Sequence, residues 1–159
     1  MSTPPYVAVV GPGQTDDAEL LDRARLAGRL LAEHGCVVLT GGLGGVMAAA
    51  AAGVAEVGGT AVALLPGSDR SAASPGHTVA VATGLGELRN ALLVRSVDAV
   101  LALLPATGTS WGTLSEVALA ARTGVPVVAV GPWGLPGPEV SAYDDVPQAL
   151  ERLRALLPR

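Results

Sequence analysis

The sequence predicts an α/β protein with a doubly wound parallel sheet of the Rossmann type. Its length of 159 residues suits a single domain spanning residues 1–159. Two observations lead to this prediction. Short apolar runs alternate with segments of helical periodicity along the chain. Several of these runs are apolar at every position, as in parallel strands covered on both faces.

The expected strands are short apolar runs that end at turns. Tyr6–Val10 is closed by Gly11-Pro12-Gly13, and the run at 99–104 is apolar on both faces, which is typical of a central strand. Strands are expected at residues 6–10, 37–39, 60–65, 78–82, 99–104 and 125–130. The segments 66–76 and 131–145 are rich in turn-forming residues, so we expect them to be loops.

The expected helices lie between these strands. Asp16 followed by Glu19 forms a capping-box pattern, and apolar residues then repeat at helical spacing to about His34. The alanine-rich segment 46–57 is apolar nearly all round, which predicts a buried helix. Further helices are expected at about 86–96, at 113–123 and after Asp145.

Composition excludes several kinds of chemistry. The net charge is -4 without a basic run, so nucleic acid is not an expected partner. All ten basic residues are arginines, and without lysine neither a Walker-type phosphate loop nor a pyridoxal Schiff base can form. The two histidines lie near no acidic cluster, so no metal site is expected, and no cofactor is required.

The apolar runs are too short to span a membrane, and the N-terminus has no signal-peptide pattern. The single cysteine, Cys36, lies in an apolar run and is expected in the core. These features predict a cytoplasmic protein. His77 precedes the fourth expected strand, and we expect it at the surface.

Glycine-rich turns follow several of the expected strands and should gather at one edge of the sheet. They contain Gly11 and Gly13, then Gly41, Gly42, Gly44 and Gly45, and then Gly84 and Gly86. The first turn lacks the third glycine of a dinucleotide fingerprint, and Thr40 stands where an acidic ribose ligand is expected, which disfavours NAD. Free N–H groups at such turns suit a phosphate, although glycine can also serve turn geometry alone.

Two charged residues stand out beside these turns. Arg89 falls in the first turn of its helix, where a cation opposes the helix dipole, so it is either a solvated side chain or a functional one. Glu116 is either the last residue of a capping box that begins at Thr113 or a site carboxylate. If the fourth and fifth strands are neighbours, both side chains reach one ligand. Trp111 is either a pocket or subunit-contact residue or an ordinary half-buried tryptophan.

The motifs Thr40-Gly41-Gly42-Leu43-Gly44-Gly45-Val46-Met47, Thr83-Gly84-Leu85-Gly86-Glu87-Leu88-Arg89-Asn90 and Gly112-Thr113-Leu114-Ser115-Glu116 resemble those of the LOG-like Rossmann family. Members of that family are often mislabelled as lysine decarboxylases. The resemblance is greatest to its short bacterial members, which are related to molybdenum cofactor carrier proteins. It extends from Val7 to about Val130.

The resemblance implies a homodimer and a nucleotide site at the glycine-rich edge. Arg89 and Glu116 would be the catalytic residues of a phosphoribohydrolase, which hydrolyses the N-glycosidic bond of a nucleoside 5'-monophosphate. Residues 108–113 would hold the phosphate. The remaining residues implied for nucleotide binding are Gly11, Gly13, Gly41, Gly42, Gly44, Gly45, Met47, Asn90, Gly108, Thr109, Ser110, Gly112 and Thr113.

The sequence departs from the enzyme pattern at the phosphate turn. Thr109 and Ser110 stand where the enzymes have two glycines, and Asn90 stands where the plant-type enzymes have lysine. The changed turn bears on catalysis more than on nucleotide binding, and Asn90 favours the carrier-like branch. Because Arg89 and Glu116 are retained, hydrolysis of a nucleoside 5'-monophosphate is still the main expectation, and the resemblance also implies an alternative function. In that alternative, the protein is a non-catalytic binding or carrier protein for a phosphorylated pterin, namely molybdenum cofactor, or for a nucleotide.

Overall fold

The computed structural model describes residues 3–108, 110–134 and 137–158. Its elements, in chain order, are β1 (Tyr6–Val10), α1 (Ala18–Glu33), β2 (Val37–Thr40), α2 (Val46–Glu56), β3 (Ala61–Leu65), the 3-10 turn η1 (Arg70–Ala72), β4 (Val79–Ala82), α3 (Leu88–Arg95), β5 (Ala99–Leu103), α4 (Trp111–Arg122), β6 (Val127–Val130), β7 (Val140–Tyr143) and α5 (Val146–Leu156).

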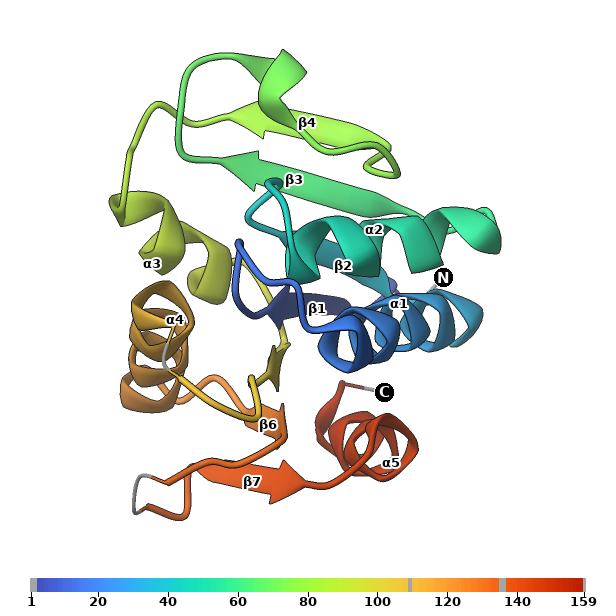
Figure 1. The fold of residues 1–159 in the computed structure, drawn as a ribbon, viewed down its shortest axis with the longest axis vertical. Coiled ribbons are helices and arrows are strands. Elements are labelled where there is room, and N and C mark those ends of the chain that lie inside the picture. Colours follow the sequence, from blue (N-terminus) through green and yellow to red (C-terminus); the bar gives the residue numbers. More distant parts are fainter. Residues whose placement is uncertain (1–2, 109, 135–136, 159) are drawn as a thin grey trace.

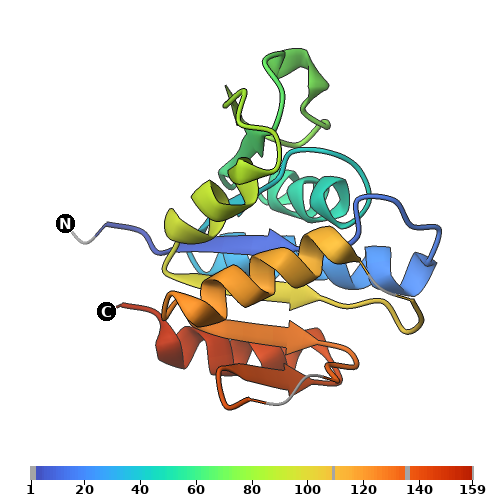
Figure 2. The same cartoon turned by 90° about the vertical axis from the view of Figure 1, so that its left-hand side faces the viewer.

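The strands form one seven-stranded parallel sheet in the order β4-β3-β2-β1-β5-β6-β7. Figure 2 shows the strands pointing the same way, with both termini at the opposite edge from the strand tips. The chain winds outward from β1 in one direction and then, from β5, in the other. The predicted doubly wound Rossmann-like fold is therefore confirmed, and its topological switch point lies between β1 and β5.

Helices cover both faces of the sheet (Figure 1). Alternate strand residues such as Val7 and Val9 pack under α1, α2 and α5, whereas Ala8 and Val10 pack under α3 and α4. This two-sided burial explains why the central strands are apolar at every position. Cys36 is buried in the first of these cores, as predicted. Within the described residues, no helix is long and apolar enough to cross a membrane.

Small residues bring α1 and α2 close together. A Cβ atom added at Gly28 would lie 2.0 Å from the Ala50 carbonyl oxygen, and one added at Gly53 would lie 1.9 Å from that of Arg25. Each helix backbone therefore occupies the space that a side chain of its neighbour would need. The alanine-rich composition of α2 serves this approach.

Four predictions about the helices and strands are wrong. The loop expected at 131–145 contains β7, a short strand whose edge pairing with β6 offsets its unfavourable flanks. The cap of α1 is Asp17, whose carboxylate accepts from the Leu20 N–H, and not Asp16. Helix α4 begins at Trp111, two residues before the expected start, because Ser110 caps it. Finally, β4 and β5 are not neighbours, because β3, β2 and β1 lie between them.

Candidate functional site

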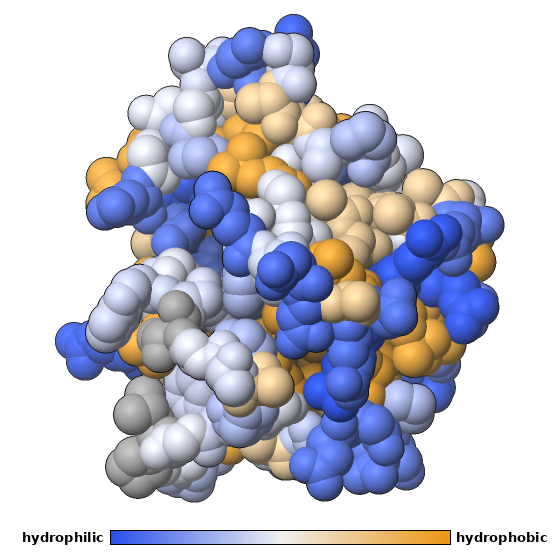
Figure 3. Space-filling model, in the orientation of Figure 1, coloured by the Kyte–Doolittle hydropathy of each residue, from blue (hydrophilic) through white to orange (hydrophobic). Residues whose placement is uncertain are grey.

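Three adjoining cavities open at the switch point, where the chain leaves the carboxyl ends of β1 and β5. A deep pocket of about 110 Å³ lies beneath an open groove of about 580 Å³, and a side pocket of about 300 Å³ lies towards β6. Ser110 lines all three. Figure 3 views the face onto which the strand ends open, and its centre carries mainly near-neutral and hydrophilic residues.

The deep pocket brings together most of the residues predicted from the sequence. Its lining comprises Val9, Val10, Gly11, Gly13, Gly41, Met47, Arg89, Asn90, Ser110, Gly112, Thr113 and Glu116. Arg89 and Glu116 meet there because α3 and α4 pack side by side on one face of the sheet (Figure 1). Both side chains line one pocket, but helix packing brings them together and strand adjacency does not.

Arg89 is buried, with 8% of its surface exposed. Its Nη1 donates to the carbonyl oxygens of Gly41 at 2.5 Å and Leu64 at 2.6 Å, at the ends of β2 and β3. These bonds fix the guanidinium and offset its position in the first turn of α3. Burial lowers the pKa of Arg89, and the nearby Glu116 partly counters this effect. The interpretation of Arg89 as a solvated side chain is therefore wrong.

Asn90 links this arginine to α4. Its Oδ1 accepts from Arg89 Nε at 3.1 Å, and its Nδ2 donates to the Ser115 hydroxyl at 3.2 Å. Among the described residues, Nη2 is the guanidinium nitrogen without a protein acceptor. The Arg89 side chain can therefore present one fixed, charged donor to a ligand in the deep pocket.

Glu116 is buried, with 7% of its surface exposed, and it lines the same pocket. Burial raises the pKa of its carboxyl group from 4.5 to about 7, although Arg89 acts to lower it. The ion pairs found in the described part of the chain join Arg23 to Glu19 and Arg25 to Glu56. Arg89 and Glu116 thus line the same pocket without a direct ion pair.

The capping interpretation of Glu116 is wrong, because the cap of α4 is Ser110. The Ser110 hydroxyl accepts from the Thr113 N–H at 3.3 Å and from the Thr113 hydroxyl at 2.8 Å. Glu116 lies almost two turns into the helix, beyond the reach of its free N–H groups. A charged side chain buried there without a capping role costs free energy, which is expected where function overrides stability.

The glycines of the site serve two purposes. Gly41 leaves space for a close approach, since an added Cβ atom would lie 2.7 Å from both Arg89 Nη1 and the Met47 sulfur. Gly42, by contrast, packs against Leu65 and Ala63. Gly44 and Gly45 pack against the turn that contains Gly13. Gly42, Gly44 and Gly45 do not line the three cavities, and their contact with a ligand stays a prediction.

The phosphate turn is only partly placed. Gly108 lines the groove and the side pocket, and Thr109 lies outside the described residues. Trp111 is 77% exposed, so the half-buried interpretation is wrong, and it lines none of the three cavities. Sequence reasoning missed Pro132 and Trp133 of the side pocket. They follow β6 directly, so the strand-end rule that located the glycine turns could also have found them.

His77 is half-buried, and the expectation of a surface residue is wrong. Its Nε2 lies 2.7 Å from the Thr40 hydroxyl, and its Nδ1 lies 3.0 Å from the Ser74 carbonyl oxygen. The same Thr40 hydroxyl accepts from the Gly42 N–H at 2.9 Å. Burial lowers the pKa of His77. The neutral imidazole therefore anchors the loop before β4 to the glycine turn that follows β2.

Together these features define a Rossmann-type protein with a group of adjoining cavities at its switch point. A sequence model of the SLOG cluster4 family matches residues 4–152, and the chain belongs to that family. An uncharacterized protein of Archaeoglobus fulgidus is 37% identical over 126 residues, which are 79% of this chain and 80% of the relative.

Two solved structures extend the comparison over nearly the whole chain. The molybdenum cofactor binding protein of Rippkaea orientalis is 31% identical, with a TM-score of 0.89, over 98% of this chain and 99% of that one. The Moco carrier protein of Chlamydomonas reinhardtii is 34% identical, with a TM-score of 0.84, over 97% and 98%. The resemblance to carrier-type members is confirmed, whereas these matches do not support a LOG enzyme specifically.

Proposed function

We propose that this protein binds a phosphorylated pterin of the molybdenum cofactor type as cargo, or a nucleotide of similar shape, without converting it. The observation that carries the proposal is the buried Arg89, held by two strand-end carbonyls with Nη2 available at a glycine-lined pocket. Such a fixed donor suits a phosphate. The full-length similarity to molybdenum cofactor binding and carrier proteins supports the same ligand class.

The sizes of the cavities fit a ligand with a small anionic end. A volume of about 110 Å³ is well below that of a typical small-molecule site, so the deep pocket suits the phosphate and not the bicyclic ring. The groove above it shares Gly13, Ser110 and Gly112 with the pocket, so it can hold the part of the ligand that adjoins the phosphate.

The test is loading with molybdenum cofactor under anaerobic conditions, followed by gel filtration and measurement of protein-bound molybdenum and pterin. The native protein should retain both, and Arg89→Gln should retain about tenfold less because the fixed charge is lost. Arg95→Gln is the matched control, since Arg95 lies on the exposed side of the same helix. Equal retention by all three proteins, or none by the native protein, contradicts the proposal.

The second candidate is hydrolysis of a nucleoside 5'-monophosphate, which one observation favours. Burial brings the pKa of Glu116 to about 7, where a carboxyl group serves well as a general acid or base. Release of free base from a panel of nucleoside monophosphates tests it, with Glu116→Gln expected to lose about 10²–10³ in rate. If the native protein releases no base, the hydrolase candidate is rejected.

We also propose that the protein is a homodimer. Leu88 at the start of α3 is 70% exposed and Trp111 at the start of α4 is 77% exposed, on two adjacent helices. Large exposed apolar side chains of this kind suit a subunit contact. Light scattering at micromolar concentration should give twice the monomer mass, and Leu88→Gln should lower it. A monomeric native protein would refute the contact.

A further inference from the structure

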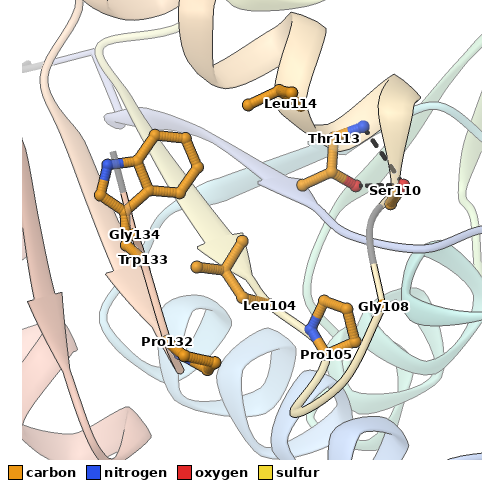
Figure 4. A pocket seen from close by; sticks show the side chains of 9 residues that line it. All are labelled: Leu104, Pro105, Gly108, Ser110, Thr113, Leu114, Pro132, Trp133 and Gly134. Carbon is orange, nitrogen blue, oxygen red and sulfur yellow. Dashed lines mark hydrogen bonds between the residues drawn. The ribbon is translucent and has the colours of Figure 1, made fainter. Parts of the chain in front are cut away.

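The side pocket is an apolar cavity beside the anion site, and the function proposed above assigns it no part of the ligand. Figure 4 shows its lining residues, which come from the end of β5, the start of α4 and the segment after β6. They are Leu104, Pro105, Gly108, Ser110, Thr113, Leu114, Pro132, Trp133 and Gly134. The cavity measures about 300 Å³, at the lower end of the range for small-molecule sites.

Its walls suit a flat, apolar surface. Trp133 and Leu114 offer an aromatic ring and an aliphatic chain, and Pro105 and Pro132 carry no backbone N–H that a bound ring would strip of water. Trp133 is half-buried and packs against the core beneath α3 and α4. Its indole is therefore held in place before a ligand arrives, which lowers the entropic cost of stacking.

The side pocket connects to the anion site. Ser110 and Thr113 line both it and the deep pocket, while Pro105 and Gly108 line both it and the groove. In Figure 4, Ser110 and Thr113 stand at one side of the cavity and Trp133 at the other. A ligand with its phosphate near Ser110 can therefore direct a ring towards Trp133.

We infer that the side pocket receives the planar bicyclic heteroaromatic ring of the phosphorylated ligand, with Trp133 as its stacking platform. The inference rests on the proposed function and adds the residue that selects for a ring. Pterins and purines share this ring chemistry, since both present flat π-faces to an indole. The lining offers few polar side chains that could recognise ring substituents. The pocket should therefore accept flat rings in general and should discriminate little between different substituents.

The two tryptophans allow a direct test. Trp111 and Trp133 are the only tryptophans in the chain, so Trp111→Phe leaves Trp133 as the sole reporter and Trp133→Phe leaves Trp111. Guanosine 5'-monophosphate should quench the emission of Trp111→Phe saturably and should leave that of Trp133→Phe nearly unchanged. Ribose 5-phosphate, which has the phosphate but no ring, should bind in calorimetry without quenching Trp133.

Affinity provides the second readout. Trp133→Ala should weaken the binding of guanosine 5'-monophosphate by roughly 5- to 150-fold, the usual effect of losing one stacked base, and Trp133→Phe should retain most of the native affinity. Affinity for ribose 5-phosphate should stay within about twofold, which also shows that the variant is folded. A parallel titration with neopterin phosphate distinguishes a pterin from a purine. The preferred ring is the one whose affinity falls more strongly on Trp133→Ala.

Three results would overturn the inference. First, Trp133→Ala could bind guanosine 5'-monophosphate as tightly as the native protein does. Second, it could lose affinity for guanosine 5'-monophosphate and ribose 5-phosphate by the same factor. In either case the ring does not occupy the side pocket. If ribose 5-phosphate still binds the native protein in these cases, the proposed function stands without the ring site. If no phosphorylated compound binds the native protein, the proposed function fails and the ring site fails with it.

Discussion

Replacing Glu116 by glutamine should stabilise the protein above neutral pH and leave it nearly unchanged in acid. Burial raises the pKa of this carboxyl group from 4.5 to about 7, so the folded protein holds the proton more tightly than the unfolded chain does. The contribution of Glu116 to the unfolding free energy therefore falls as the pH rises from about 4.5 to 7 and stays constant at higher pH. Glutamine has the shape of the protonated acid and carries no such penalty.

The magnitude follows from the shift. A rise of roughly 2.5 pKa units, at about 1.4 kcal/mol each, makes the ionised carboxylate cost about 3 kcal/mol in the folded state. The difference in unfolding free energy between Glu116→Gln and the native protein should grow from below about 1 kcal/mol at pH 5 to about 3 kcal/mol at pH 8. Both proteins keep all other titrating groups, so these cancel in the difference.

Urea unfolding at pH 5, 6, 7 and 8 measures this difference. The control is Glu151→Gln, the same change at an exposed position inside α5, which should give a much smaller difference in unfolding free energy. A difference for Glu116→Gln that does not change between pH 5 and 8 would refute the reasoning. So would a variant that is less stable than the native protein at pH 8, because the carboxylate would then be stabilised by its surroundings.

Three further predictions follow from the same contacts. Arg89→Gln should lower the unfolding free energy by about 2–4 kcal/mol in urea, because two strand-end carbonyls lose their donor, and an unchanged midpoint would contradict this. Gly28→Ala should lower the unfolding free energy by about 3 kcal/mol, although alanine is the better helix former, because its Cβ atom meets the Ala50 carbonyl. The control is Gly67→Ala at an exposed position. A rise in the melting temperature of Gly28→Ala would refute the close packing of α1 and α2. A phosphorylated ligand should favour protonated Glu116, because an ionised carboxylate repels the phosphate. The affinity of the native protein relative to that of Glu116→Gln should therefore fall as pH rises through 7, which calorimetry at pH 6 and 8.5 should detect. A constant ratio of affinities would place the ligand away from the carboxyl group.

The sequence by itself determined the fold class, because strands buried on both faces must be apolar at every position and their helices must show helical periodicity. It also located the glycine turns, and Arg89 stood out because a cation in the first helical turn opposes the helix dipole. Glu116 stood out only through the resemblance of its motif, since its spacing by itself fits a capping box equally well. The strand β7 escaped it, because a four-residue edge strand that closely follows Gly137-Pro138 and precedes two aspartates gains its stability from pairing with β6.

The tertiary structure decided how the site is assembled. Arg89 and Glu116 share a pocket because α3 and α4 pack together, although their preceding strands lie four places apart in the sheet order. The carbonyl partners of Arg89 lie 48 and 25 residues away along the chain, which no local pattern encodes. Burial raises the pKa of Glu116, and burial is a property of packing between elements. Local sequence fixes which residues can form helices and strands, whereas the protonation and the neighbours of a buried side chain depend on contacts between distant segments.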